Sequence, residues 1–599
     1  MTCPTTPRTI SSKLCDIKSV KDYGATGDGV TDDTAAIQLA FNANVPLFFP
    51  QGTYKITSTL TISNSTIHLY GSGDSSVLNF STNGELKLVC TRSSLPNLAS
   101  NIQAGGNVIS FSTAHGLSEG DVIVAYNPTD FSFGPHRNYY RDGCFFKVAD
   151  PTNSTNIKTY STSPDTYALG SMTMTKLTGG KVHISNLKII PPSGSSKIAL
   201  TVEGHEGVVI RDISLNTGAT GTGIAIQTCF DIDVKNLKAT ARRSASFPSS
   251  DSYPIVFLNS QKITVSNCSL YSDRHCIAMG GGLGPPVRNV IIDHCILEND
   301  GELGVGAADM HGNSDDVLYT NCIIQHANMA GRNVSYKNCK IYGRPTSTLL
   351  GAGDLGLSND GSCIWGSEVV GGTFTIQNCE LITYGNCSSA GCVYLDVDKI
   401  TEDFKLIMHN NTMENKGSSP STHRCVMLYS GGSSAPTDKI NIDIRGLNHK
   451  ADEAFSILSF LGNNDVSANL SIIIDDIIAP SGTRLAVFDS SANAAAPMRL
   501  QKQHYTEQLT TSTSDYKVVS SAWIFRYPYP TTRLPRIIAT AGSADGTPVT
   551  PNRGGKVSSV FVNSYSATTA RITVASGDGN NFTSAETIRI FAEASINEL

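Results

Sequence analysis

An eight-residue pattern that recurs through the middle of the chain limits the possible folds more than any other feature. The pattern reads apolar-x-apolar-x-Asn-apolar/Cys-x-apolar, with occasional replacement of the Asn. Its strong copies start at Val182, Val208, Ile232, Ile263, Val290, Val317, Val334 and Phe374, and weaker copies start at Leu406 and Ile472. The strong starts are 26, 24, 31, 27, 27, 17 and 40 residues apart, so loop length varies while the eight-residue core does not.

Each copy predicts two short strands joined by a one-residue bend. The apolar residues alternate with period two, which gives a strand one buried face. At the Asn the alternation changes phase, so this residue occupies a turn in which its amide can bond the backbone. Such a coil cannot bury its apolar face alone and must stack on its neighbours. We therefore predict an all-β chain built on a parallel β-helix with rungs about 4.8 Å apart. A β-sandwich is the alternative, but it does not explain one phase for the Asn.

The cysteines follow the same repeat. Fifteen cysteines are present, and five of them directly follow the turn residue. These five are Cys268, Cys295, Cys322, Cys339 and Cys379. We expect them to be reduced, buried and stacked as a column beside a ladder of Asn residues, because they pack as small apolar groups. No pair of CxxC elements occurs, so a zinc site is not predicted, and no cofactor is expected.

A turn and a short helix precede the repeat. The segment 28–41 begins with acidic residues and continues with helix-forming ones, and Thr31 or Asp32 can cap the helix. Ile37 and Phe41 give it an apolar stripe at i, i+4 spacing. A solenoid needs its open end covered, and we expect this helix to do so.

The copies of the pattern also indicate the domain organisation. We predict a short N-terminal segment (1–19), the capping helix with the first coils (20–88) and an inserted β module (89–178). The main β-helix would follow at 179–480 and a C-terminal β domain at 481–599. In the insertion, residues 108–111 and 121–126 read as strands, and 570–574 and 587–591 do so near the C-terminus.

Composition excludes several classes of function. Charged residues make up 16% of the chain and the net charge is −6, with no basic cluster, which argues against nucleic acid as a partner. No run approaches eighteen apolar residues, so membrane insertion is not expected. The first residues lack the apolar core of a secretory signal, and we expect a chain that is folded inside a cell or has been trimmed.

One segment resembles a known family. Residues 20–37, VKDYGATGDGVTDDTAAI, followed by FPQGTY at 49–54, are similar to the entrance of the pectate-lyase-like β-helices of bacteriophage tailspikes. The resemblance implies a right-handed parallel β-helix, a homotrimer, and an activity that binds and cleaves a bacterial surface polysaccharide. It also implies a place on the virion tail, contacts with other tail or baseplate proteins through the N-terminus, and a C-terminal domain for trimer locking or sugar binding.

Acidic residues and histidines are concentrated between 271 and 316, where the coil length varies. The 27-residue interval between coils places Asp300 over Asp273 and Glu302 over His275, about 4.8 Å away. Asp309 and His311 share strand parity, so we expect them on one face, roughly 7 Å apart. Glycosidic cleavage needs two carboxyl groups, about 5 Å apart for retention or about 6.5–9.5 Å apart for inversion, and stacked rungs supply such distances.

These residues receive distinct roles in the hypothesis. Glu302 would be the general acid and Asp309 the base or nucleophile, while His311 polarises or positions the substrate and Asp300 is a supporting carboxylate. Arg274 and His275 would bind substrate. The alternative is that the same groups form loop turns and salt bridges.

A second cluster lies in the 40-residue coil and the coil after it. Its members are Asp354, Asp360, Trp365, Glu368, Asp396 and Asp398. Trp365, Glu368 and Asp396 are predicted substrate contacts, because an indole is a natural platform for a sugar face; burial of Trp365 under the loop is the alternative. Arg332 is a further predicted substrate contact. Arg332 and Asp315 each precede a copy of the pattern by two positions, so we also expect them to stack as an ion pair.

The leading functional prediction is a tailspike endoglycosidase that hydrolyses a capsular or O-antigen polysaccharide. A lyase acting by β-elimination is a second possibility, because Arg274, Arg332 and Lys337 could neutralise a uronic acid. The sequence is also compatible with a fibre that binds the receptor without cleaving it and with a secreted pectinolytic enzyme.

Overall fold

The computed structural model describes most of the chain, in two units that are treated separately below, 1–334 and 335–599. Described residues are 18–595 except 64–65, 82, 130–135, 193–197, 218–221, 243–252, 300–305, 344–361, 384–390, 417–423, 432–435, 451–455, 463–468, 479–483, 489–497, 504, 511–522, 527–535, 543–558, 566–568 and 576–586.

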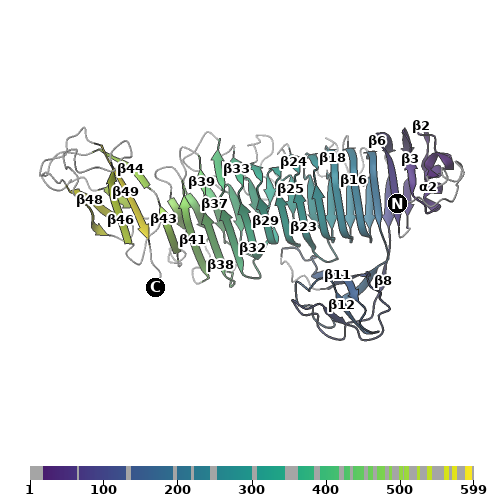
Figure 1. The fold of residues 1–599 in the computed structure, drawn as a ribbon, viewed down its shortest axis with the longest axis horizontal. Helices are drawn as coiled ribbons and strands as arrows, with labels where there is room; N and C mark the ends of the chain where they lie inside the picture. The colour runs from purple at the N-terminus through teal and green to yellow at the C-terminus, as the bar shows by residue number, and fades with distance from the viewer. Residues whose placement is uncertain are drawn as a thin grey trace, which may run out of the picture. The chain divides into compact units, whose positions relative to one another are not determined.

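The first unit contains the predicted parallel β-helix, with strands stacked rung upon rung (Figure 1). The strands on both sides of the bend belong to one sheet: β1 (Lys18–Ser19), β2 (Asp28–Asp32), β3 (Leu47–Phe49), β4 (Gly52–Ile56), β6 (Ile67–Phe80), β14 (Val182–Ile190), β16 (Glu206–Thr217), β18 (Phe230–Ala241), β20 (Gln261–Ser266), β21 (Ser269–Ser272), β23 (Val287–Asp293), β24 (Ile296–Asn299), β26 (Ser314–Thr320) and β27 (Ile323–Gln325). The starts of the copies at Val182, Val208, Ile232, Ile263, Val290 and Val317 are paired in direct register. The prediction of stacked coils is confirmed.

A third strand per coil forms a second parallel sheet, which the pattern did not reveal. Its members in this unit are β5 (Thr59–Ile62), β7 (Glu85–Val89), β15 (Leu200–Glu203), β17 (Ile224–Gln227), β19 (Ile255–Leu258), β22 (Ile277–Gly280), β25 (Ala308–Met310) and β28 (Ala327–Asn328). The later strands β22 and β25 are buried on both faces and β19 nearly so, and their sequences do not alternate, whereas β5 and β15 do alternate.

The turn residue of each copy has the left-handed conformation that the bend requires. Its φ lies between 51° and 55° in every described strong copy, at Asn186, Asp212, Asn236, Asn267, His294, Asn321, Asn338 and Asn378. Asn tolerates this region better than other non-glycine residues, which explains its recurrence. The side chains form the expected ladder in part; the Asn236 Nδ2 donates to Asp212 Oδ1 at 2.8 Å and Asn321 Nδ2 to Asp293 Oδ1 at 2.9 Å.

The five cysteines beside the ladder are buried and free, as predicted. In the first unit Cys268, Cys295 and Cys322 occupy successive rungs, and the Cys295 amide lies 3.4 Å from Cys322 Sγ. The column therefore consists of packed thiols.

The helix before the repeat, α2 (Thr34–Asn42), follows the short 3-10 turn η1 (Val20–Tyr23). Ile37 and Phe41 are buried as expected. The N-cap position belongs to Asp33 rather than to Thr31 or Asp32, which corrects the prediction. The carboxylate of Asp33 turns back to accept from the amides of residues 26 and 27, so it does not cap the helix through its side chain, whereas Asp32 accepts from the Thr34 amide at 3.1 Å.

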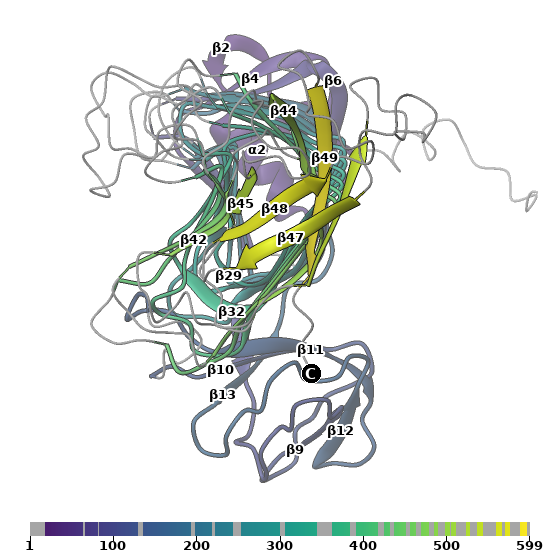
Figure 2. The ribbon, with the colours of Figure 1, turned by 90° about the vertical axis from the view of Figure 1, so that its left-hand side faces the viewer.

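An insertion between β7 and β14 forms an antiparallel sheet of its own (Figure 2). Its strands are β8 (Arg92–Ser94), β9 (Val108–Ser110), β10 (Val122–Tyr126), β11 (Gly143–Asp150), β12 (Asn156–Thr159) and β13 (Thr173–Leu177). Fourteen buried residues, among them Ile109, Phe146 and Tyr167, give it a separate apolar core.

The second unit also contains parallel coils, followed by antiparallel strands. The coil strands are β29 (Gly331–Lys337), β30 (Lys340–Tyr342), β31 (Ile364–Gly366), β32 (Val369–Gln377), β33 (Glu380–Thr383), β34 (Val393–Asp396), β35 (Phe404–His409), β36 (Thr412–Asn415), β37 (Arg424–Tyr429), β38 (Ile440–Arg445), β39 (Asn448–His449), β40 (Ser456–Leu461), β41 (Leu470–Ile477), β42 (Arg484–Phe488) and β43 (Met498–Gln503). The antiparallel strands are β44 (Tyr505–Thr510), β45 (Trp523–Arg526), β46 (Arg536–Gly542), β47 (Ser559–Tyr565), β48 (Thr569–Ala575) and β49 (Thr587–Ser595).

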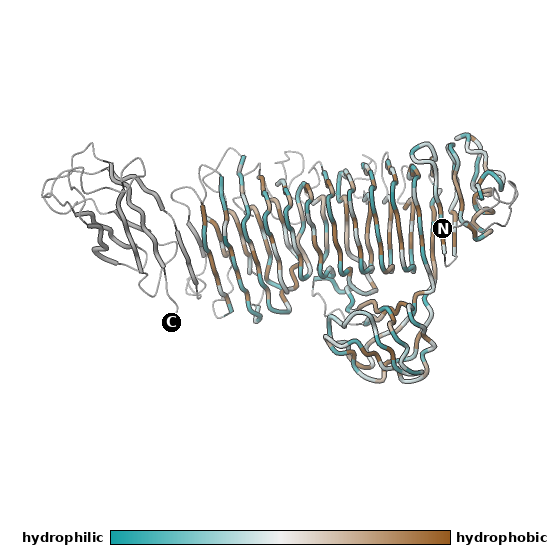
Figure 3. The backbone as a smooth tube through the Cα atoms, viewed as in Figure 1, coloured by the Kyte–Doolittle hydropathy of each residue, from teal (hydrophilic) through white to brown (hydrophobic). Residues whose placement is uncertain are grey.

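Parallel pairing therefore continues to Gln503, beyond the boundary expected at 480. The last two coil strands carry no turn Asn in the repeated position, so the pattern stops before the coils do. Apolar and polar residues alternate along the strands that flank the bends, such as β20 and β38, and Figure 3 shows both kinds of residue by colour along the described coils.

Candidate functional site

The structure brings together four of the predicted site residues: Arg274, His275, Asp309 and His311. Asp309 lies on β25, in the sheet of third strands, and pairs with Ala278 of β22. Arg274 and His275 lie in the short connection just before β22, and His311 directly follows β25. Two adjacent coils thus supply the cluster.

The Asp309 carboxylate is the centre of this cluster. Its Oδ2 lies 3.6 Å from His275 Nε2 and 3.5 Å from His311 Nε2, and its Oδ1 accepts a hydrogen bond from Asn328 Nδ2. The side chains of Asp309 and His275 are each 6% exposed, while that of His311 is 31% exposed. Asp309 and His311 lie on the same face, as their parity predicted.

The proton positions on His275 follow from its partners. His275 Nδ1 lies 2.7 Å from the carbonyl oxygen of Gly306, which can only accept, so Nδ1 carries a hydrogen. Burial lowers the pKa of His275 although Asp309 opposes this effect. The neutral ring would then present the lone pair of Nε2 to the carboxylate of Asp309.

An aromatic ring supports the neighbouring residues. Tyr253 lies beside His275 with ring centres 5.4 Å apart, and the Arg274 guanidinium lies 5.3 Å from the centre of the same ring. Neither Tyr253 nor Asn328 was predicted. The position of Asn328 follows from strand pairing, since Ala308 pairs with Ala327, but no local pattern marks it as a site residue.

The 27-residue interval that predicted the stacking of Glu302 over His275 changes in this part of the chain. The interval of 27 residues holds up to the pair Ser272 and Asn299, but Ile277 pairs with Ala308, 31 residues later. The connection between β24 and β25 is four residues longer than the interval predicts, and the partner of His275 is therefore Gly306. Asp300 and Glu302 themselves lie outside the described residues.

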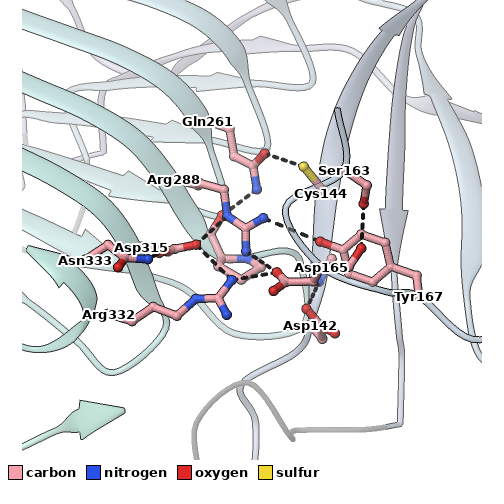
Figure 4. Close-up of polar contacts among 12 residues, drawn as sticks. Asp142, Cys144, Ser163, Asp165, Tyr167, Gln261, Arg288, Asp315, Arg332 and Asn333 are labelled. Carbon is pink, nitrogen blue, oxygen red and sulfur yellow. Dashed lines mark hydrogen bonds and ion pairs between the residues drawn. The ribbon is translucent and has the colours of Figure 1, made fainter. Parts of the chain in front are cut away.

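Arg332 lies apart from this cluster, at the junction of the insertion with the coils (Figure 4). Its Nη2 is 3.0 Å from Asp315 Oδ2, which confirms the predicted ion pair, and 2.6 Å from Asp165 Oδ2 in the insertion. Arg288, at 2% side-chain exposure, contacts the same two carboxylates at 2.9 and 2.8 Å. The structure thus places Arg332 in an interdomain ion cluster and not beside Asp309.

The described members of the second cluster lie in the second unit. Trp365 is 5% exposed and stacks on Tyr394 with ring centres 4.0 Å apart, which corresponds to the packed alternative. Burial raises the pKa of Asp396 to about 6, although the hydrogen bond from the Asp398 amide opposes this effect. Glu368 lies between β31 and β32 and is partly exposed. Asp354 and Asp360 lie outside the described residues.

A groove lies on the outer face of the first unit. It has a volume of about 390 Å³ and crosses the strands that follow the turn residues, from β6 to β24. Its lining residues include Asp74, Lys188, Lys238, Tyr271 and Glu298. In the described part of the chain, no helix is long and apolar enough to cross a membrane, and no group of three or more His, Cys, Asp or Glu is arranged to hold a metal ion.

Comparison with known proteins relates this chain to carbohydrate-active β-helices. Residues 17–347 match the family model for rhamnogalacturonase A/epimerase, pectate lyase-like, and residues 217–483 match that for Gp49, pectin lyase-like. The preneck appendage protein of Bacillus phage PZA is 42% identical over 55 residues, which are 9% of this chain and 6% of that protein. A glucan 1,3-beta-glucosidase of Cochliobolus carbonum is 50% identical over 48 residues, 7% of this chain and 6% of that protein. The alignments thus span a small part of these relatives.

Solved tailspikes resemble the chain over nearly its whole length. The tailspike gp49 from Pseudomonas phage LKA1 has a TM-score of 0.77 at 26% identity, covering 97% of this chain and 100% of that one. The tailspike gp61 of Pseudomonas phage phi297 has a TM-score of 0.79 at 24% identity, covering 97% and 99%. The gp54 tailspike of Acinetobacter baumannii bacteriophage AP22, solved with a capsular saccharide, has a TM-score of 0.75 at 18% identity and full coverage of both chains. The resemblance to tailspikes that the entrance motif predicted is confirmed.

Proposed function

The chain belongs to the rhamnogalacturonase A/epimerase, pectate-lyase-like family, and we propose that it is a phage tailspike that hydrolyses a bacterial surface polysaccharide. Tailspike folds and pectate-lyase-like family models support a carbohydrate-binding or depolymerising function on a virion tail. The observation that carries the proposal is the buried Asp309 carboxylate between two imidazoles on the outside of the second sheet.

The geometry favours base catalysis by Asp309 acting through His311 over a nucleophilic role for Asp309. A nucleophile must touch the sugar, and the side chain of Asp309 is only 6% exposed. His311 is the exposed partner, so in this proposal it contacts the reacting water and Asp309 stabilises the charge that the imidazole gains. Glu302 remains the proposed acid and Asp300 a supporting carboxylate. A base that acts on water corresponds to inversion at the anomeric carbon.

Digestion of purified capsular and O-antigen polysaccharides from candidate hosts tests this proposal. New reducing ends are counted for the wild-type chain and for Asp309→Asn and His311→Gln, with an expected loss of about 10²–10⁴-fold in rate. His294→Gln is the matched control, because its imidazole also faces a carboxylate, Asp293 at 2.8 Å, on an exposed turn. Loss in the control equal to that in His311→Gln, or full activity in both Asp309 and His311 variants, would contradict the assignment.

A lyase is the second candidate, favoured by one observation. The partly exposed His311 could remove a proton, and Arg274, held over Tyr253, could neutralise a uronate carboxyl. The ultraviolet absorbance of an unsaturated product distinguishes elimination from hydrolysis. Binding of a polysaccharide with no change in its size would instead identify a non-cleaving fibre.

We also propose a homotrimer that attaches to the tail through its N-terminal residues and acts at the host surface. Sedimentation equilibrium of the full chain is the test, and a mass of one chain of 63.6 kDa would refute the trimer.

A further inference from the structure

We propose that the groove on the outer face of the first unit binds an anionic glycan whose acidic groups alternate with neutral sugars. This inference rests on the proposed function, because a chain that meets no polysaccharide would not use such a surface. It concerns a surface separate from the Asp309 cluster, built on the strands that follow the turn residues. Its role is binding and not bond cleavage.

Two rows of side chains line the groove, and strand pairing determines their order. In the first row, Lys188 pairs with Ser214, Ser214 with Lys238, and Lys238 with Ser269. In the second row, the members are Asn216, Thr240, Tyr271 and Glu298, paired in that order. Hydroxyl, amide and ammonium groups therefore recur at the rung interval, an arrangement suited to a linear polymer that runs across the strands.

The charges in the groove specify an anionic ligand. Lys188 and Lys238 are two rungs apart, about 10 Å, with the small Ser214 between them. Neither ammonium group has an ion-pair partner among the described residues, and both line a groove of about 390 Å³. An acidic group over each lysine would gain two charge-assisted hydrogen bonds without losing existing ones.

The ends of the groove limit the charge density of that ligand. Asp74 lies at one end and Glu298 at the other, and the chain has a net charge of −6. A polymer with a charge on every unit, such as a nucleic acid, would be repelled there, whereas one with a charge on every second sugar can place neutral sugars over the carboxylates. The ring of Tyr271, with the Arg242 guanidinium 4.8 Å from its centre, offers a partly apolar surface for a sugar face.

The strands of the groove are connected along the chain to the proposed catalytic residues. Its last two rungs are β21 and β24, and the chain continues from β21 directly to Arg274 and His275. The chain after β24 contains Asp300 and Glu302. A glycan held in the groove is thus anchored by strands whose ends carry the residues proposed for cleavage.

Titration of the full chain with hyaluronan octasaccharide, which has one carboxylate per disaccharide, tests the proposal by calorimetry at low salt. We expect the affinity for hyaluronan to be about tenfold lower in the double variant Lys188→Gln/Lys238→Gln than in the wild-type chain. This figure combines two exposed charge contacts, each of which contributes about fivefold or less to affinity. The matched control is Lys235→Gln, an exposed lysine on the same strand β18 but before the turn at Asn236, which should bind as the wild type does. A dextran oligosaccharide, which is neutral, should not respond to the lysine changes.

Three results would overturn the proposal. These are no hyaluronan binding by the wild-type chain, equal binding by the double variant, or a changed sedimentation mass in the double variant, which would identify the groove as a contact between copies of the chain. The readout is independent of cleavage, so Asp309→Asn should lose depolymerase activity and keep this binding. Failure of the proposed hydrolysis and failure of the groove are therefore distinguishable.

Discussion

Replacing Asp142 by Asn should make the insertion bind the coils more firmly, with an effect that grows between about pH 4 and pH 6 and is constant above that range. Burial raises the pKa of Asp142 from 3.8 to about 6, and the neighbouring Asp165 carboxylate also raises it. The hydrogen bond from the Gly143 amide lowers this pKa, but by less than Asp165 raises it. A raised pKa means that the docked state favours the protonated acid. Protonation stabilises docking fully below about pH 3.8, and this stabilisation is lost progressively as pH rises from there to about 6.

The magnitude follows from the size of the shift. A change from 3.8 to about 6 is about two pKa units, or about 3 kcal/mol at pH 8 as an upper bound, because the carboxyl keeps some contact with solvent. Asn has the same shape and can still accept from the Gly143 amide, whose donor distance is 2.7 Å. Asp142→Asn should therefore stabilise the docked insertion fully at pH 8, by about half as much at pH 5, and hardly at all below about pH 3.8.

Hydrogen exchange of the amides in β10 and β11 measures this effect, because local opening of the insertion exposes them. Asp121→Asn is the control; it removes a partly exposed ion pair with Lys176, 2.7 Å long, in the same module, and should cost at most about 1 kcal/mol. Asp165→Asn should cost about 3–5 kcal/mol, since it leaves the two guanidinium groups of Arg288 and Arg332 with Asp315 as their one shared carboxylate among the described residues. Equal protection of wild type and Asp142→Asn at pH 8 would refute the reasoning.

Three shorter predictions concern other parts of the fold. Asn321→Ala should lower the unfolding free energy by about 1–2 kcal/mol, because φ at this position is 55°, a left-handed conformation that alanine disfavours. Asn321→Gly should lower it less, because glycine adopts this conformation readily, and the midpoints of denaturant unfolding compare the two variants. Iodoacetamide should label the partly exposed Cys90 in the native chain but label Cys295 only after unfolding, as peptide mass spectrometry would report. Burial lowers the pKa of His449 to about 4, so the contribution of this residue to stability should fall as pH drops from about 6.5 toward 4. His449→Gln should remove this part of the decrease in thermal stability at acidic pH, which thermal unfolding measures.

The coils could be predicted because their outer and inner positions alternate and because the bend selects Asn. Asn186 and Asn267 mark the same left-handed turn in coils far apart in sequence. The third strand could not be predicted in this way. Residues 255–258, for example, are apolar without alternation, and periodicity does not distinguish such a run from a buried helix segment.

A second series of left-handed residues also escaped prediction. Asp231, Lys262, Asn289, Asp316 and Asn333 each precede a copy of the pattern and have φ between 53° and 61°. Their residue types vary, so no single letter marks the position. Hydrogen bonds between neighbours, such as that from Asn289 Nδ2 to Asp316 Oδ2 at 2.7 Å, help to hold this turn.

The interdomain ion cluster shows a different limit. The pairing of Asp315 with Arg332 could be predicted because both hold fixed positions in the repeat. Asp165 comes from the insertion, where no repeat exists, and Arg288 is buried only because the insertion covers it. A sequence pattern cannot indicate which solvent-facing positions another module will cover. Arg332, which belongs to the interdomain ion cluster, was therefore predicted to be a substrate contact.

The two proposed catalytic groups, Asp309 and Glu302, come from different parts of the coil, a strand and a connection, and this difference leads to a test. Asp309 is positioned by a strand, whereas Glu302 lies in the connection whose four extra residues invalidated the stacking argument. If Glu302 is the acid, Glu302→Gln should abolish the alkaline limb of the pH–rate profile, whereas Asp309→Asn should lower the rate and keep that limb. A profile that keeps both limbs in Glu302→Gln would exclude it as the acid. The next candidate would then be Asp273, a carboxyl at 8% exposure two residues before His275.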